Sequence, residues 1–272
     1  MFLYSLIQLP LSHIWYIMGE VRAKKSLGQH FLTDKNIALK IAQSLSVNDD
    51  VHVLEIGPGT GVLTDHLLAK YQYFNAIEID TESVEFLTSK HKDAAEWLIE
   101  GDFLNYQMST IAPNLAVIGN FPYYISSQIF FKVLESKDQV CEVVCMIQKE
   151  VADRLASSPG TKKYGLLSVL LQAYYDIEYL FTVHEHCFQP APKVKSAVIR
   201  LKRNKRLSLD CDEQLFKKIV KATFNQRRKT IRKSLQSIFI NLGENKYGQK
   251  RPEQLSVEEF EELTLFVEKE VI

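Results

Sequence analysis

The alternation of short apolar runs with helix-like segments is the feature that most constrains how this chain folds. The predicted strands cover residues 51–56, 73–80, 96–102, 115–120 and 140–148. Helical spacing of apolar residues predicts helices at 62–70 and 82–91, and others that begin at Ser126 and Lys149. Strands and helices that alternate in this way form βαβ units, so we predict an α/β fold with a mainly parallel sheet. The carboxyl ends of its strands should face one crevice.

The pattern changes in the second half of the chain. Residues 175–183 and 196–203 predict two more strands, which we expect to close the sheet as an antiparallel pair. From about residue 208 onward only helical spacing remains. We therefore predict an α/β domain over residues 18–206 and a small, all-helical domain over residues 207–272.

The first 17 residues form an apolar run that needs its own interpretation. The run lacks the basic residues and the small-residue cleavage site of a signal peptide. Pro10 interrupts it, and it is too short to span a membrane. We predict that residues 1–17 are a non-native or disordered extension and that translation starts at Met18. The alternative is an apolar arm that packs on the domain.

A glycine-rich turn, "LEIGPGTGVLT", follows the first predicted strand and leads into a helix. Gly57, Gly59 and Gly61 let the backbone approach a ligand closely, and the helix start favours polar groups. The motif by itself also fits a simple tight turn. Pro58 and the carboxylate of Glu55 suit a pyrophosphate poorly, since that carboxylate would repel it.

Acidic residues end the next two predicted strands. Glu78 stands where a carboxylate can accept hydrogen bonds from both hydroxyls of a ribose. Asp102 can accept from an exocyclic amine such as adenine N6. Each acid alone fits a solvated loop. Glycine, Glu and Asp at three successive strand ends together predict a pocket for an adenosine.

The fourth strand ends in "GNFPYYIS", where an amide, a rigid imide and two phenols stand together. A turn needs none of these side chains, so the cluster indicates a site for a flat object with a polar edge. Asn-x-Pro-Tyr at this place resembles the motif of S-adenosylmethionine enzymes that methylate amino groups of nucleic-acid bases.

Six motifs in order make the resemblance specific: "KKSLGQHFL", "EIGPGTG", "GNFPYYIS", "QKEVADRL", "FQPAPKVKSAVIRL" and "FNQRRKTIRKSL". Between about Lys24 and Leu235 the chain resembles the KsgA family of ribosomal RNA adenine N6,N6-dimethyltransferases. The resemblance implies a Rossmann-like methyltransferase domain that binds S-adenosylmethionine, followed by a helical RNA-binding domain. It also implies a substrate: two adjacent adenosines in the 3′-terminal hairpin loop of 16S ribosomal RNA, dimethylated late in small-subunit assembly.

The resemblance also implies which residues bind the cofactor. By match of motif these are His30, Leu32, Gly57, Gly59, Glu78, Ile79, Asp102, Phe103 and Asn120. The chain departs from the family pattern at His30, where many members carry Asn, and at Phe121, where Leu is common. A contact through the side chain at position 30 would be altered, whereas a backbone contact would not.

Asn120, Pro122 and Tyr123 are the predicted catalytic residues. The lone pair of an adenine amine is delocalised into the ring, so the amine needs hydrogen-bond acceptors rather than a strong base. Asn120 offers a side-chain carbonyl and Pro122 a backbone carbonyl, while Tyr123 offers a face for stacking. Phe188 is the candidate for the opposite face of the base. The chemistry needs no metal, and the base must be unpaired or flipped out.

Basic residues are concentrated although the formal net charge is zero. Residues 217–233 contain eight basic residues and no acidic one, and smaller clusters occur at 200–206 and 22–25. We predict that one short helical stretch binds RNA phosphates. Its RNA-binding residues are Arg227, Arg228, Lys229 and Arg232. The alternatives are a solvated helix face, or pairing with the acidic tail at Glu258, Glu259, Glu261 and Glu262.

Two other functions stay open at this point: dimethylation of large-subunit ribosomal RNA, and a non-catalytic role in ribosome assembly. The four cysteines form no CxxC pair, which fits reduced thiols in a cytoplasmic protein. The two histidines of "HEH" at 184–186 lack a third metal ligand nearby. We expect a monomer without a metal or a membrane, whose partner is small-subunit ribosomal RNA within a 30S assembly intermediate.

Overall fold

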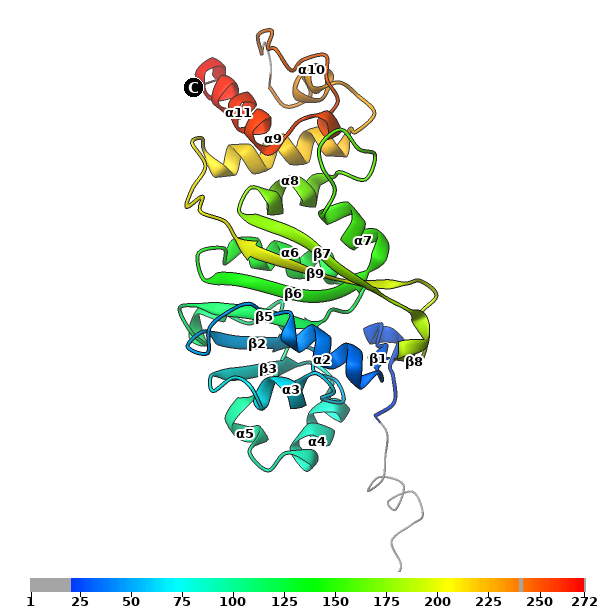
Figure 1. Ribbon diagram of the computed structural model, residues 1–272. Coiled ribbons are helices and arrows are strands. Elements are labelled where there is room, and N and C mark those ends of the chain that lie inside the picture. Colours follow the sequence, from blue (N-terminus) through cyan, green and yellow to red (C-terminus); the bar gives the residue numbers. More distant parts are fainter. Residues whose placement is uncertain (1–20, 240–241, 272) are drawn as a thin grey trace, which may run out of the picture.

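The computed structural model describes residues 21–239 and 242–271, and within them a seven-stranded sheet forms the centre of the molecule (Figure 1). Its strands are β2 (His52–Ile56), β3 (Phe74–Glu78), β4 (Leu98–Glu100), β5 (Leu115–Asn120), β6 (Val140–Gln148), β7 (Tyr175–Val183) and β9 (Ser196–Arg203). The spatial order is β4-β3-β2-β5-β6-β9-β7. All seven strands predicted from the sequence are therefore confirmed.

The pairing of the strands follows the expected pattern. Strands β2 to β6 pair in parallel, and β9 pairs antiparallel with both β6 and β7. The predicted closing pair is thus correct, and β9 lies between its two antiparallel neighbours. The carboxyl ends of the parallel strands share one edge of the sheet, so the loops that follow them lie together.

Helices cover both faces of the sheet. Successive side chains of a strand point to opposite sides, so the buried strands present apolar side chains on each face. The helices of this part are α2 (Lys35–Gln43), α3 (Thr64–Leu68), α4 (Thr81–Lys90), α5 (Ala94–Trp97), α6 (Ser126–Glu135), α7 (Lys149–Leu155) and α8 (Leu166–Gln172). Val53 and Ala116 pack with Ile41 of α2, whereas Leu54 and Val117 pack in the core that contains Phe130 of α6. Two apolar cores result, one on each face.

The described residues after β9 form helices joined by loops, with no strand among them. They form α9 (Glu213–Asn225), α10 (Ile231–Leu235) and α11 (Val257–Val271), with a short 3-10 turn at Pro252–Gln254. Helix α8 packs against both α9 and α11, and the Phe216 and Phe260 rings meet edge to face at 6.5 Å. Residues of these helices belong to the same buried cluster as β5 and β6, so one continuous core joins them to the sheet.

The basic segment does not form the single helical stretch that the sequence predicts. Helix α9 ends at Asn225, and a turn closed by the Lys229 N–H and the Gln226 carbonyl (2.7 Å) separates it from α10. Arg227, Arg228 and Lys229 therefore lie in a loop. Like charges spaced four apart repel each other on a helix, which disfavours continuation through this segment.

A small antiparallel pair, β1 (Phe31–Leu32) with β8 (Phe188–Gln189), was not predicted. Helix α2 was not predicted either, although Asp34 caps it by accepting hydrogen bonds from two backbone N–H groups of its first turn. The predicted extension over residues 1–17 and the predicted start at Met18 lie outside the described residues. Within the described ranges, no helix combines the length and apolar character that crossing a bilayer requires.

Candidate active site

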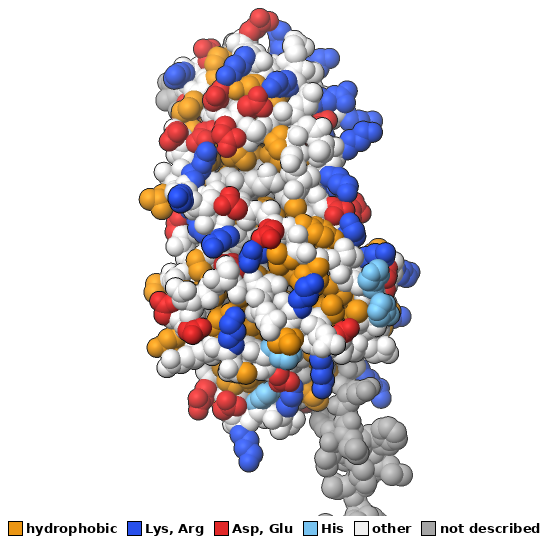
Figure 2. All heavy atoms as spheres, in the orientation of Figure 1, with side chains coloured by type: hydrophobic (Ala, Val, Ile, Leu, Met, Phe, Trp, Pro, Cys, Tyr) orange, Lys and Arg blue, Asp and Glu red, His pale blue; other side chains and the backbone are white. Residues whose placement is uncertain are grey.

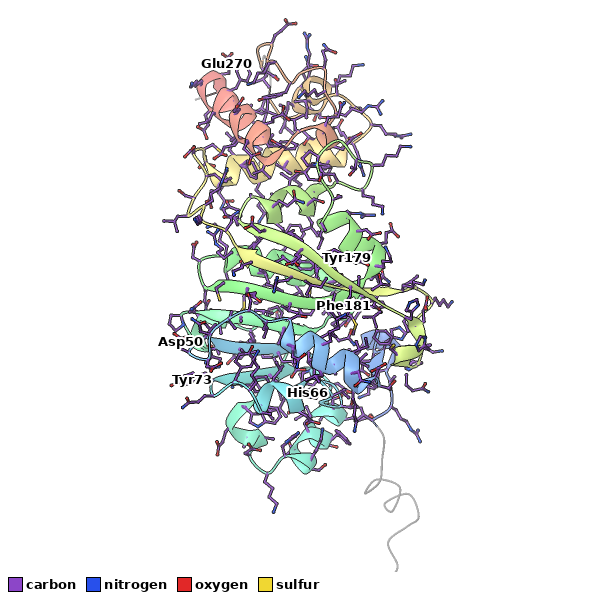
Figure 3. All side chains as sticks on the ribbon, viewed as in Figure 1. Asp50, His66, Tyr73, Tyr179, Phe181 and Glu270 are labelled. Carbon is purple, nitrogen blue, oxygen red and sulfur yellow. The ribbon has the colours of Figure 1, made fainter. Side chains whose placement is uncertain are left out.

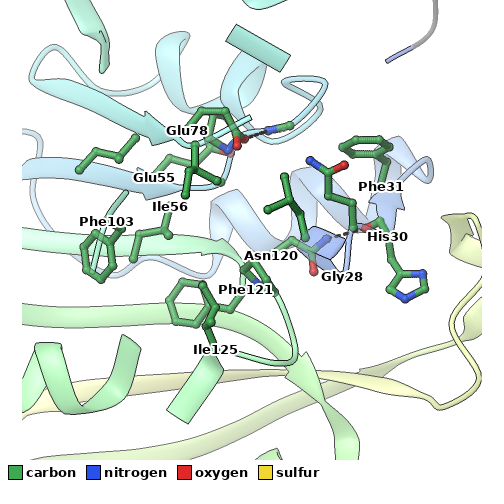
Figure 4. Close-up of a pocket in the computed structure, with 18 of the residues that line it drawn as sticks. Gly28, His30, Phe31, Glu55, Ile56, Glu78, Phe103, Asn120, Phe121 and Ile125 are labelled. Atoms are coloured by element: carbon green, nitrogen blue, oxygen red, sulfur yellow. Dashed lines mark hydrogen bonds between the residues drawn. The ribbon is translucent and has the colours of Figure 1, made fainter. Parts of the chain in front are cut away.

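A cavity of about 310 Å³ opens at the carboxyl ends of β2, β3, β4 and β5 (Figure 4). Its walls are the segment before and through β1, the glycine-rich turn after β2, and the loops that follow β3, β4 and β5. The structure brings together at this cavity eleven residues that the sequence singles out. They are His30, Leu32, Gly57, Gly59, Glu78, Ile79, Asp102, Phe103, Asn120, Pro122 and Tyr123.

The glycine-rich turn brings bare backbone to the cavity. Gly57 has a positive φ of 67°, and a methyl group added there would meet no atom within 4 Å. The same addition at Gly59 would come within 2.9 Å of the Phe31 ring, so β1 packs directly over the turn. The cavity therefore reaches the backbone at Gly57, which leaves room for a ligand to lie against it.

Glu78 is fixed at the end of β3. Its carboxylate accepts hydrogen bonds from the backbone N–H groups of Gly59 and Asp80, both at 2.9 Å, and the residue is only 4% exposed. Burial raises the pKa of Glu78, while these two hydrogen bonds oppose that increase. Each oxygen keeps a lone pair, so the carboxylate can still accept from the hydroxyls of a ribose.

Asp102 is held by its own loop. One carboxylate oxygen accepts from the Leu104 N–H (2.9 Å) and the other from the Asn105 side-chain amide (2.7 Å). Phe103 is buried beside it, whereas the Ile79 side chain is half exposed and lines the cavity wall. An apolar wall next to a carboxylate suits a flat base with an exocyclic amine.

Glu55 lies buried at the end of β2 and also lines the cavity. Its carboxyl accepts a hydrogen bond from the Thr64 hydroxyl (2.7 Å), and burial raises the pKa of Glu55 to about 8. The carboxyl is therefore largely uncharged at neutral pH. The expectation that Glu55 repels a pyrophosphate required a charged carboxylate, so the structure removes its basis.

Glu55→Gln is expected to stabilise the protein at pH 8 but not at pH 5. Between pH 4.5 and 8 the unfolded chain ionises Glu55 while the folded protein keeps it protonated, so this carboxyl lowers stability as the pH rises. The loss in the free energy of unfolding grows by about 1.4 kcal/mol per pH unit in that window. Denaturant unfolding at both pH values measures the difference. Equal effects at pH 5 and pH 8 would contradict the prediction, and exposed Glu96→Gln serves as the control.

Asn120 is oriented by the backbone of a distant segment. Its side-chain NH₂ donates to the His30 carbonyl at 2.9 Å (Figure 4). Because a carbonyl only accepts, this contact fixes which end of the amide is Nδ2. No described residue donates to Oδ1, so the Asn120 carbonyl oxygen is left to accept a hydrogen bond from a ligand.

The His30 side chain does not support Asn120, because its ring has other partners. The Nδ1 atom lies 2.7 Å from the Pro190 carbonyl oxygen, and the ring stacks on Tyr123 at 5.6 Å between centroids. The ring points away from Asn120 and Glu78 in Figure 4. The backbone of residue 30 thus supports the site, and that role does not depend on which side chain stands there.

The Tyr123 ring is held by a contact at its hydroxyl group and by stacking on His30. The phenol lies 2.6 Å from the Ser196 hydroxyl at the start of β9, and burial raises the pKa of Tyr123. The phenol is therefore neutral at physiological pH. Ser196 was not predicted from the sequence, because no local motif marks it.

The Pro122 carbonyl accepts a hydrogen bond from the Ile125 N–H (3.2 Å) and keeps its second lone pair.

Asp80 ties the N-terminal segment to the rim of the cavity, a role that was not predicted from the sequence either. Its carboxylate accepts from the side chains of Lys24, Gln29 and Ser83. Burial alone would raise the pKa of Asp80, but these hydrogen bonds outweigh it and hold the pKa below its usual value. The turn at Lys25–Leu27 is thereby fastened beside the strand that carries Glu78.

A family model described as ribosomal RNA adenine dimethylase matches residues 20–264, which is most of the chain. This chain belongs to the ribosomal RNA adenine dimethylase family. A relative from Parabacteroides distasonis, named ribosomal RNA small subunit methyltransferase A, is 53% identical over 259 residues and covers 93% of this chain and 96% of its own. A protein of the same name from Cytophaga hutchinsonii is 54% identical over 252 residues, covering 91% and 98%.

Solved structures confirm the predicted Rossmann-like fold of this adenine dimethylase family member. A dimethyladenosine transferase from Plasmodium falciparum superposes with a TM-score of 0.75 at 23% identity, covering 89% of this chain and 99% of that one. The 23S rRNA methyltransferase ErmE gives a TM-score of 0.65 at 26% identity, covering 86% and 99%.

The remaining predicted substrate residues of this family member lie outside the cavity wall. Phe188 is 3% exposed and packs in β8 opposite Leu32 of β1, so its ring has to move before it can stack on a base. Arg227 donates to the Lys162 carbonyl and pairs with Glu253, and Arg232 pairs with Glu244 at 2.9 Å.

Arg228 and Lys229 are exposed and form no ion pair within the described ranges. The tail carboxylates proposed as their alternative partners pair elsewhere, with Arg206, Lys246 and Lys250. Figure 2 shows Lys and Arg side chains gathered along the right-hand edge of the helical part, the side on which α7 follows β6 in Figure 1. The two cations are therefore available to bind phosphate.

The two histidines of the "HEH" segment stack on each other at 5.8 Å between ring centroids. Among the residues that the structure describes, no group of three or more His, Cys, Asp or Glu side chains is arranged to hold a metal ion.

Proposed function

We propose that this chain uses S-adenosylmethionine to dimethylate N6 of two adjacent adenosines in the 3′-terminal hairpin loop of 16S ribosomal RNA. The observation that carries the proposal is the orientation of Asn120, whose amide donates to the His30 carbonyl and leaves Oδ1 as an acceptor beside the cavity. The relatives named ribosomal RNA small subunit methyltransferase A support the choice of the small subunit.

The residues present fit S-adenosylmethionine. Open space beside Gly57 and Gly101 accommodates a ligand against the backbone, Glu78 has lone pairs for the ribose, and Ile79 and Asp102 flank the place for the adenine. When bound, the cofactor supplies a methyl group already activated by the sulfonium. The protein therefore contributes mainly position and orientation.

The target amine needs acceptors that draw its hydrogens out of the plane of the base. Asn120 Oδ1 accepts one of them, and the Pro122 carbonyl accepts the other through its second lone pair. Tyr123 presents a fixed ring on which the base stacks, which contributes ~1–3 kcal/mol. As the methyl group transfers, the amine gains positive charge and releases a proton to solvent.

An adenine inside a duplex cannot reach this cavity, so the enzyme takes an unpaired or flipped base. Residues 207–272 form the unit that binds the surrounding RNA, with Arg228 and Lys229 in contact with phosphates. The enzyme acts as a cytoplasmic monomer on a 30S assembly intermediate late in small-subunit biogenesis. Because the formal net charge is zero, RNA binding depends on the local basic segment and not on the charge of the whole surface.

The test uses labelled S-adenosylmethionine with separated ribosomal subunits from a strain that lacks the modification. Label on two adjacent adenosines of 16S RNA, mapped by nuclease digestion and mass spectrometry, is the expected result. Label on large-subunit RNA would replace the proposal with a 23S dimethylase. Binding to the small subunit without any label would indicate a non-catalytic assembly factor.

A further inference from the structure

Tyr124 is a large ring left exposed at the mouth of the cavity. It follows Tyr123 directly, lines the same cavity and is 56% exposed. Its phenol has no hydrogen-bond partner among residues 21–239 and 242–271, whereas the Tyr123 phenol contacts Ser196. Neighbouring tyrosines therefore have different surroundings: Tyr123 is fixed inside and Tyr124 faces outward.

One side of the Tyr124 ring is supported by the backbone. Gly28 has a positive φ of 57°, and a methyl group added there would lie 2.9 Å from Cδ1 of Tyr124. The absence of a side chain at Gly28 thus lets the ring rest against the N-terminal segment. Since Lys24 fastens that segment to Asp80, the support is itself held in place.

The N-terminal segment that supports this ring is positively charged. The turn that ends at Gly28 carries Lys25, and Arg22 precedes it; both are exposed and form no ion pair in the described part of the chain. An exposed aromatic ring that rests on a segment with free cations is a combination that binds single-stranded nucleic acid, in which bases stack and phosphates pair with cations.

We propose that Tyr124 is the platform on which the base of the nucleotide next to the target stacks. This inference rests on the proposed function. When one adenosine enters the cavity, the RNA backbone keeps its neighbour at the mouth, where the open face of Tyr124 meets it. Stacking requires no particular base, so Tyr124 only positions the substrate RNA. The shape of that RNA then determines whether it is recognised.

The test compares Tyr124→Ala with Tyr124→Phe in methylation of unmodified small subunits. We expect Tyr124→Ala to raise KM for the subunit about 5- to 150-fold, which is the ~1–3 kcal/mol of a base–aromatic stack converted at about 1.4 kcal/mol per tenfold. Tyr124→Phe should stay within about twofold of the wild type, because the ring stacks and the phenol has no partner. The affinity for S-adenosylmethionine, measured by calorimetry, should not change in either variant.

Tyr73→Ala is the matched control. Tyr73 is 48% exposed and its ring stacks on His52, so the loss of aromatic surface is similar. Tyr73 directly precedes β3, whereas the cavity lies at the carboxyl end of that strand, and Figure 3 shows Tyr73 at the left-hand side of the sheet. This variant should methylate normally.

Three outcomes would overturn the inference: an unchanged KM in Tyr124→Ala, a parallel loss in Tyr124→Phe, or a loss of cofactor affinity that shows the ring only shapes the pocket wall. Failure of the proposed function gives a different result, since the wild-type protein itself would then leave the small subunit unlabelled.

Discussion

Asn120→Ala is expected to reduce kcat for methyl transfer about 100- to 1000-fold. Deleting one preorganised hydrogen-bonding group that stabilises developing charge has a cost of this size in other enzymes. Here the deleted group is the Oδ1 acceptor, which we propose stabilises positive charge on the amine. The substitution also removes the hydrogen bond to the His30 carbonyl, a single contact, so the fold should remain intact.

The measurement is single-turnover methylation of unmodified small subunits at saturating S-adenosylmethionine, so that a change in cofactor affinity does not contribute. Asn36→Ala is the control, because Asn36 is an exposed residue of α2 outside the cavity wall. A kcat within about threefold of the wild type in Asn120→Ala would exclude this role for the amide.

Arg228→Glu combined with Lys229→Glu is expected to lower kcat/KM for the small subunit at least about 100-fold. Each charge-assisted hydrogen bond to a phosphate contributes about 1.5–3 kcal/mol, and reversal adds repulsion. The salt dependence of binding should also flatten, by a log–log slope of roughly one for each phosphate that the variant no longer binds. Arg232 is avoided because its partner Glu244 would be left beside a new carboxylate.

The control for this variant reverses Lys70 and Lys92, two exposed lysines near α3 and α5. It changes the net charge equally and should retain activity. The melting temperature and the affinity for S-adenosylmethionine should match the wild type in both double variants. An unchanged salt slope in the first variant would mean that the loop does not contact phosphate.

The sheet was predictable because its signals are local. Most of its strands are apolar runs, and the alternation with helices specifies parallel pairing. The β1–β8 pair has only two residues in each strand and joins segments far apart in the chain, so no local pattern marks it. Helix α2 did carry a signal, the cap at Asp34 followed by apolar residues at helical spacing.

The candidate site was partly predictable for a related reason. Residues at the ends of parallel strands must lie together, which brings Glu78, Asp102 and Asn120 to one cavity. Their supporting contacts come from elsewhere in the chain: Ser196 holds Tyr123, and the His30 carbonyl orients Asn120. Such partners are set by tertiary packing. The roles of the site residues stay predictions until the variants are measured.

The continuous core between the sheet and the C-terminal helices has a consequence for substrate choice. Helix α8 packs on both parts, and a large apolar contact of this kind resists hinge motion. The distance from the Arg228 loop to the cavity is then constant. An RNA can engage both places only when its folded backbone presents a phosphate at that same separation from a free adenine. If the Arg228 loop binds phosphate as proposed, an RNA with the right sequence but a different fold could not bridge the two places.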